Sequence, residues 1–173
     1  MDLFKLGIKF FMTDTHAVQV QDFIAIFQKW IQGQVIQDHL LVDVHNYSHI
    51  HNGPGILLVA HEGNFSIDSA DGRTGLLYQR KHPGGNPLKT ARQACSLLEA
   101  DPALKGRIRF RTDELQLIAN DRLLAPNDDK TFSQLESALL SSLQPAFEGK
   151  RLKLTRTSQD PKERLTIRAE ISS

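Results

Sequence analysis

The sequence predicts an α+β fold in which a mixed, mostly antiparallel sheet carries about three helices, all within a single domain spanning residues 1–173. Several segments alternate apolar and polar residues with the period of two that a half-buried strand requires. Three other segments place apolar residues at the spacing of one helical face. The elements follow in the order strand, helix, several strands, helix, hairpin, helix and hairpin, which is neither a strict βαβ alternation nor an all-β pattern.

The first third of the chain predicts one strand, one helix and two further strands. Apolar residues alternate with polar ones over 4–10, which indicates the first strand. A helical apolar stripe follows, with Asp22 in place to cap its first turn and Gly33 to end it. Short apolar runs over 40–44 and 56–60 predict two strands, separated by a loop dense in asparagine, glycine and proline.

The middle of the chain predicts an antiparallel meander and a second helix. Segments 64–69 and 76–81 are joined through Asp71-Gly72, a dipeptide suited to the positive φ angles of a tight hairpin turn. A helix over 88–100 follows, with Asn86 at its N-cap and Pro87 at its first position. Its apolar side is made of small residues, so the helix can pack closely against a sheet.

The last third predicts two hairpins around a third helix. Apolar residues alternate with arginines over 107–111, which favours a strand that begins the first hairpin. The helix begins at a capping box, formed either by Thr131–Gln134 or by Ser133–Glu136. The terminal hairpin is predicted from the apolar residues of 152–154 and 165–171.

Composition places the chain among ordinary globular proteins. Hydrophobic residues make up 40% and charged residues 24% of the sequence, and the net charge of +1 provides no global field that would drive binding to nucleic acid or to an anionic membrane. No run of about 18 apolar residues is present, so no membrane association is expected. Cys95 is the only cysteine, and the first twelve residues lack the pattern of a signal peptide, so we expect a cytoplasmic protein.

A histidine-rich segment is the first candidate site. His45, His49 and His51 lie close together in sequence and near Asp43, and imidazole and carboxylate ligands together suit zinc or iron. These three histidines are the candidate metal ligands. The same pattern also fits polar residues at strand ends and in a solvated loop, where no metal is required.

A second candidate uses His61 and Glu62 without a metal. The two residues follow the apolar run 56–60, so they emerge at the end of a buried strand, with Glu62 as the candidate general base and His61 as its acid partner. Adjacent residues of a strand point to opposite faces, so a turn or bulge is needed to bring both side chains into one pocket.

The third candidate is a cationic stripe. Arg107, Arg109 and Arg111 share one face of their predicted strand, and more basic residues follow on the terminal hairpin: Arg151, Lys153, Arg164 and Arg168. If these strands are neighbours, their outer face forms an anion-binding surface. Nucleic acid is disfavoured because no aromatic residue interleaves with the arginines to stack on bases. A solvated face paired with acidic neighbours explains the same pattern.

The sequence alone identifies no function, cofactor or related family. Patterns typical of nucleotide binding, of serine hydrolases and of zinc fingers are missing. We expect a non-enzymatic binding or assembly domain that self-associates as a homodimer through exposed strand edges, with a small-molecule or anionic ligand as a candidate partner. The alternative is a small hydrolase or isomerase that uses a His/Glu acid-base pair, with or without a metal.

Overall fold

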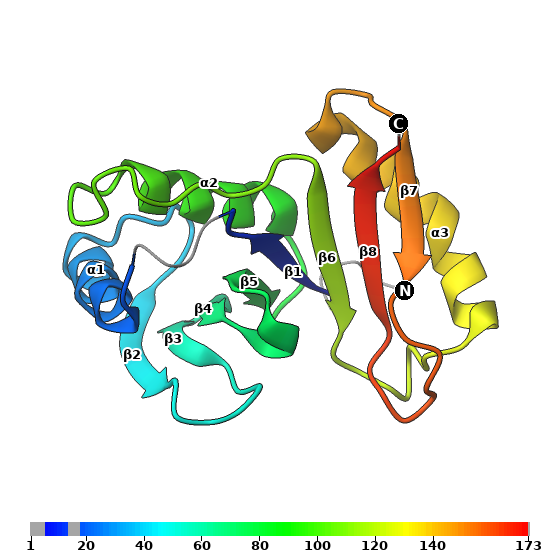
Figure 1. Cartoon of the computed structure of the whole chain (residues 1–173), viewed down its shortest axis with the longest axis horizontal. Helices are drawn as coiled ribbons and strands as arrows, with labels where there is room; N and C mark the ends of the chain where they lie inside the picture. The colour runs from blue at the N-terminus through cyan, green and yellow to red at the C-terminus, as the bar shows by residue number, and fades with distance from the viewer. Residues whose placement is uncertain (1–5, 14–17, 173) are drawn as a thin grey trace.

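The computed structural model describes residues 6–13 and 18–172, which form an eight-stranded sheet and three α-helices (Figure 1). The elements in chain order are β1 (Leu6–Phe11), α1 (Val20–Gly33), β2 (Leu41–Tyr47), β3 (Gly55–Ala60), β4 (Gly63–Asp68), the short 3-10 helix η2 (Ala70–Gly72), β5 (Gly75–Arg80), α2 (Pro87–Ala100), β6 (Glu114–Ala119), α3 (Asp129–Leu143), the 3-10 helix η3 (Gln144–Phe147), β7 (Leu152–Arg156) and β8 (Thr166–Ile171).

The strands lie in the order β2-β3-β4-β5-β1-β6-β8-β7, and every pair of neighbours is antiparallel. The predicted α+β fold, with helices packed on a mostly antiparallel sheet, is therefore confirmed. β1 is the first strand of the chain but lies inside the sheet, between the meander β2 to β5 and the C-terminal strands (Figure 1). The sheet thus joins the two parts of the chain through β1.

The helices cover one face of the sheet. α1 packs on β2 and β3, α2 on β1 and β5, and α3 on β7 (Figure 1). In every strand except β2, alternate residues enter this core, and burial of each large apolar side chain contributes roughly 1.5–3 kcal/mol. In the part of the chain that the structure describes, no helix combines the length and the apolar composition needed to span a bilayer.

The first two helices begin largely as the sequence predicts. Asp22 lies in the first turn of α1, where its carboxylate accepts a hydrogen bond of 3.0 Å from the Gln19 backbone N–H. At α2 the Asn86 side chain accepts a hydrogen bond of 3.1 Å from the Lys89 backbone N–H, and Pro87 occupies the first position. These contacts satisfy backbone groups that the first helical turn leaves free.

The third helix begins earlier than predicted. Asp128 is its N-cap and accepts a hydrogen bond of 2.7 Å from the Thr131 backbone N–H, so α3 starts at Asp129. That hydrogen bond also lowers the pKa of Asp128. The predicted starts at Thr131–Gln134 and Ser133–Glu136 were wrong, because a better acceptor precedes both.

Two strand predictions need correction. Segment 107–111 forms no strand and makes only an isolated bridge between Phe110 and Met12, because the neighbouring strand β1 ends at Phe11. The region after residue 44, predicted as a loop, continues β2 as far as Tyr47. Phe4, with which the first predicted strand begins, lies outside the described residues.

The turn between β4 and β5 is formed as the sequence predicts. Asp71 and Gly72 both have positive φ, at 57° and 71°, and Arg73 follows them directly. Glycine adopts this conformation without steric cost, and aspartate tolerates it better than most residues. The turn brings Arg73 over the face of the sheet that the helices leave open.

Candidate functional site

The face of the sheet opposite the helices, called the open face below, carries a small cluster of its own. Phe11, Leu77 and Ile118 are buried there but lie outside the main core. Lys9 lies among them, paired with Leu77 of β5 on one side and with Gln116 of β6 on the other. Its exposed fraction is only 1%, which is unusual for lysine and calls for a buried partner.

The partner of Lys9 is Asp68, at the end of β4. The Lys9 Nζ lies 2.9 Å from Asp68 Oδ1, and the same oxygen accepts a hydrogen bond of 2.7 Å from the Ala70 backbone N–H. The lysine side chain passes over Gly75, where an added Cβ would lie 3.2 Å from Lys9 Cε and 2.2 Å from the Phe10 carbonyl oxygen. The ion pair therefore fixes the start of the turn that carries Arg73.

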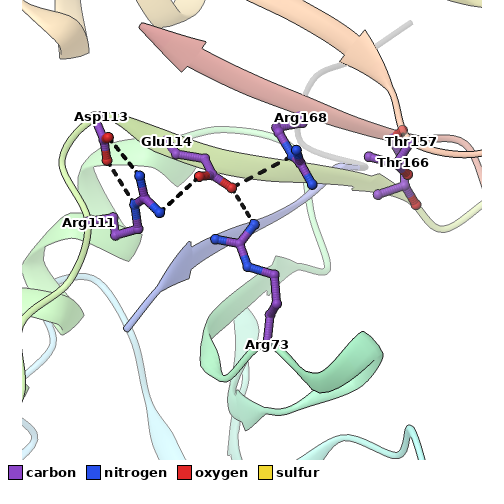
Figure 2. Close-up of polar contacts among 7 residues, drawn as sticks. All are labelled: Arg73, Arg111, Asp113, Glu114, Thr157, Thr166 and Arg168. Carbon is purple, nitrogen blue, oxygen red and sulfur yellow. Dashed lines mark hydrogen bonds and ion pairs between the residues drawn. The ribbon is translucent and has the colours of Figure 1, made fainter. Parts of the chain in front are cut away.

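Arg73 is held between an aromatic ring and a carboxylate. Its guanidinium carbon lies 3.6 Å from the centroid of the Phe11 ring, in cation–π contact. The same guanidinium donates a hydrogen bond to Glu114, the first residue of β6 (Figure 2). Because both contacts are made by one planar group, Arg73 has a defined position on the open face.

Glu114 lies at the centre of three arginines (Figure 2). Besides Arg73, the Arg111 Nη1 lies 3.5 Å from Glu114 Oε2, and the Arg168 Nε lies 3.7 Å from Glu114 Oε1. Its side chain is only 8% exposed, so these positive charges compensate a largely desolvated carboxylate. Arg73 and Arg168 thus share one anion and keep an excess of positive charge.

Arg111 has a second, exposed partner in Asp113. Two hydrogen bonds, of 2.9 and 2.8 Å, join its guanidinium to both carboxylate oxygens (Figure 2). This pairing raises the pKa of Arg111 and lowers that of Asp113, so the two shifts agree that the charged pair is favoured. Arg111 is therefore compensated more fully than Arg73 or Arg168.

A cleft of about 930 Å³ opens on this face between the β4–β5 turn and the terminal hairpin, and is called the basic cleft below. Five basic and two acidic side chains line it, although the whole chain has a net charge of only +1. The charged lining residues are Arg73, Arg122, Lys162, Arg164, Arg168, Asp71 and Glu163. Phe11, Gln116, Asn120, Thr157, Ser158 and Thr166 are among the uncharged ones.

Three of these cations have no acidic partner in the part of the chain that the structure describes. Arg122 donates a hydrogen bond of 2.6 Å to the Lys162 carbonyl oxygen, and Arg164 donates one of 3.2 Å to the Asn120 side chain. Within residues 6–13 and 18–172, none of Arg122, Lys162 and Arg164 has an acidic side chain within ion-pair distance. Their charge is available to an anion from outside.

The β7–β8 loop, which carries Lys162 and Arg164, is held in place by hydrogen bonds from Asn127. Asn127, 2% exposed, donates hydrogen bonds of 3.2 and 2.8 Å to the carbonyl oxygens of Ser158 and Asp160. Farther along the strands, the Thr157 backbone N–H and hydroxyl both donate to the Thr166 carbonyl oxygen, at 2.9 and 3.2 Å. These bonds hold the polar wall of the basic cleft in place.

The arginines predicted as a stripe are only partly brought together. Arg111 reaches Glu114, whereas Arg107 donates to the Leu104 carbonyl oxygen at 3.0 Å and Arg109 to the Ile108 carbonyl oxygen at 3.4 Å. From the terminal hairpin, Arg164 and Arg168 do line the basic cleft. The prediction of an anion-binding surface remains a prediction, but its geometry is different, because 107–111 forms no strand.

His61 and Glu62 lie in the turn between β3 and β4. The Glu62 carboxylate accepts a hydrogen bond of 2.8 Å from the Leu40 backbone N–H. Burial acts to raise the pKa of Glu62, but this hydrogen bond and the nearby His39 and His61 outweigh it, so the pKa is lowered. The His61 ring lies beside the His82 ring, with ring centroids 6.4 Å apart. Among the described residues, His61 makes no hydrogen bond to the Glu62 carboxylate, which accepts from Leu40 instead.

The three candidate metal ligands lie at one edge of the sheet. His45 is on the outer strand β2, 3.4 Å from Asp43, whereas His49 and His51 belong to the following loop and line another pocket. Across the described ranges 6–13 and 18–172, no three histidine, cysteine or acidic side chains are grouped so that they could hold a metal ion. The metal hypothesis therefore gains no geometric support.

The sequence patterns did not single out Arg73, Arg122 or Lys162, and predicted Glu114 only as one of the acidic neighbours of the arginines. Arg73 follows η2, whereas Arg122 and Lys162 lie in the β6–α3 and β7–β8 connections, far apart in the chain. The only local signal is the Asp71-Gly72 turn, which places Arg73 above the sheet once the strand order is known. Comparisons with family models, with curated proteins and with solved structures give no match.

Proposed function

We propose that this chain is a non-enzymatic binding domain that takes an anionic ligand in the basic cleft. The observation that carries the proposal is the set of three cations, Arg122, Lys162 and Arg164, that have no acidic partner among the described residues. A cleft lined by charges of one sign focuses their field and raises the local concentration of counter-ions. Carboxylates and phosphates are the groups that guanidinium donors bind best.

The surroundings of two carboxylates, Glu114 and Glu62, favour a binding role over a catalytic one. Both oxygens of Glu114 face guanidinium groups, and the Glu62 carboxylate accepts a backbone hydrogen bond that keeps its pKa low. The guanidinium groups occupy the oxygens of Glu114, and the lowered pKa of Glu62 makes it a weak general base near neutral pH. The alternative of a small hydrolase or isomerase that uses His61 and Glu62 therefore has less support.

The test is a calorimetric titration with three anions: pyrophosphate, citrate and octaglutamate. All titrations are made at the same low ionic strength. The triple variant Arg122→Gln, Lys162→Gln and Arg164→Gln should bind at least one of these anions about tenfold or more weakly than the wild type, because charge-assisted hydrogen bonds contribute over 1.4 kcal/mol each. The matched control replaces three exposed cations outside the basic cleft: Lys89→Gln, Lys130→Gln and Arg151→Gln. Equal binding by both triple variants for all three anions would refute the proposal.

Self-association as a homodimer is a separate part of the proposal. β2 and β7 are the two outer strands of the sheet, and Leu40, just before β2, and Val42, in β2, are more than half exposed. Exposed apolar edges favour pairing with a second strand. Sedimentation analysis of the wild type and of Val42→Lys tests it, and a monomeric wild type at high concentration would contradict it.

The cytoplasmic location expected from composition is also kept as a proposal. Its support is Cys95, the only cysteine of the sequence, which is buried as a thiol in the helix-covered core. Fractionation of cells that produce the protein, with antibody detection, tests this location. Recovery from an extracellular or membrane fraction would overturn it.

A further inference from the structure

We infer that the ligand of the basic cleft is an extended acidic segment of a polypeptide, an inference that rests on the proposed function. Its first support is the way the cations are distributed along β6. Arg73 and Arg168 meet at Glu114, where β6 begins, whereas Arg164 contacts Asn120, just beyond its end. Strand residues advance about 3.3 Å each, so the first and last residues of β6 are roughly 17 Å apart.

That separation fits a chain of charges better than a compact anion. A single phosphate or a small tricarboxylate reaches only one end of the row, whereas about six extended residues of a polypeptide cover its length. In Figure 2, Thr157 and Thr166, which also line the basic cleft, lie farther along the strands than the group around Glu114. A ligand that uses both ends must itself be elongated.

The two ends differ in the charge that they offer. At the Glu114 end an internal carboxylate already compensates part of the charge of Arg73 and Arg168. At the Asn120 end Arg122, Lys162 and Arg164 lack an acidic partner among the described residues. The acidic side chains of the ligand should therefore gather at the Asn120 end, with the rest of the segment running toward Arg168.

The chemistry between the two ends suits a peptide backbone. Gln116 and Asn120 present amides, which can both donate and accept hydrogen bonds, and Thr166 presents a hydroxyl. Phe11, the aromatic residue in the lining, is 3% exposed beneath the Arg73 guanidinium and offers no ring face for a base to stack on. A polypeptide is thus preferred over a single-stranded nucleic acid of similar length.

The experiment measures fluorescence anisotropy of labelled octaglutamate, diglutamate and an eight-residue oligothymidylate, with pyrophosphate as an unlabelled competitor, at low and matched ionic strength. We expect octaglutamate to bind at least about tenfold more tightly than diglutamate, with an affinity that falls as salt is added. The variant with Arg122, Lys162 and Arg164 changed to glutamine should bind octaglutamate at least about tenfold more weakly than the wild type. The control triple variant at Lys89, Lys130 and Arg151 should have an affinity for octaglutamate within about twofold of the wild type.

A further variant tests the extension of the site. Arg168→Gln should weaken the binding of octaglutamate severalfold but leave the binding of diglutamate nearly unchanged, because the short peptide is held at the Asn120 end. Thermal melts of each variant exclude unfolding as the cause. These side chains are exposed, so the melts should change little.

The remaining outcomes separate the inference from the proposed function. If pyrophosphate or diglutamate binds as tightly as octaglutamate and depends on the same three cations, the basic cleft is a small-anion site and the inference fails while the function stands. Tighter, cleft-dependent binding of the oligothymidylate overturns the inference in favour of nucleic acid. Equal losses in both triple variants, or no binding of any anion, overturn both.

Discussion

Replacing Lys9 by methionine should lower the free energy of unfolding by about 3 kcal/mol. The change leaves the carboxylate of Asp68 buried without its counterion, since the side chains of the pair are only 2% and 9% exposed. Breaking a buried ion pair in this way typically costs about 3–5 kcal/mol. The lower end applies here, because the Ala70 backbone N–H still donates to Asp68 at 2.7 Å.

The double variant Lys9→Met and Asp68→Asn should recover about 2 kcal/mol of that loss. The asparagine carbonyl can still accept from the Ala70 N–H, no charge remains buried, and the methionine packs against the apolar side chains of Leu77 and Ile118. The exposed pair of Lys150 and Glu148 gives the control. Its side chains are 56% and 83% exposed, so Lys150→Met should cost less than about 1 kcal/mol.

Urea unfolding, monitored by tryptophan fluorescence, measures five proteins: the wild type, Lys9→Met, Asp68→Asn, the double variant and the Lys150→Met control. Trp30 is the only tryptophan and is buried in α1, so its fluorescence reports unfolding. The double-variant cycle then isolates the interaction between Lys9 and Asp68. A Lys9→Met protein as stable as the Lys150→Met control, or a double variant less stable than Lys9→Met alone, would contradict this role of the buried ion pair.

Three further predictions concern other parts of the fold. Asp128→Ala should lower the melting temperature at neutral pH. Because the folded-state pKa of Asp128 is lowered, its contribution is present above the unfolded pKa of about 3.9 and is lost as pH falls through the folded value. The difference in melting temperature between the wild type and the variant should therefore persist down to about pH 4 and close only at lower pH, below the folded value. Asn127→Ala should lower the free energy of unfolding in urea by about 1–3 kcal/mol and weaken the binding of octaglutamate, because the carbonyl groups of Ser158 and Asp160 lose their donor. Unchanged stability would contradict the anchoring role of Asn127. Cys95 should react with a thiol reagent only after unfolding, because burial raises its pKa; rapid reaction of the native protein would disprove this.

The fold was accessible from the sequence because alternate strand residues and one stripe of each helix enter the main apolar core. The alternation in β1 and the apolar stripe of α1 follow from that arrangement. All of β1 is buried, however, because Lys9 and Phe11 are covered on the open face. In segment 107–111 the same alternation is present, but no strand forms. Ile108 and Phe110 are buried there as their alternation indicates, yet the partner strand stops at Phe11, and no property of the segment itself reports that.

The candidate site was less accessible, because it depends on which strands are neighbours. Glu114 gathers Arg73, Arg111 and Arg168 only because β6 lies next to β8 and the β4–β5 turn reaches over β1. Alternation assigns a residue to a face, but it does not fix strand order. The arginines of the terminal hairpin were therefore recognised as candidates, whereas Arg73 was not.

The shared carboxylate of Glu114 has a consequence for how occupancy is felt across the molecule. Arg73 comes from the N-terminal meander and Arg168 from the C-terminal hairpin, and Glu114 is the common counterion of both. An incoming carboxylate that engages Arg168 competes with Glu114 for it and leaves Glu114 more dependent on Arg73. Binding at one wall of the basic cleft would thus tighten the opposite wall, so that the two walls respond as a coupled pair.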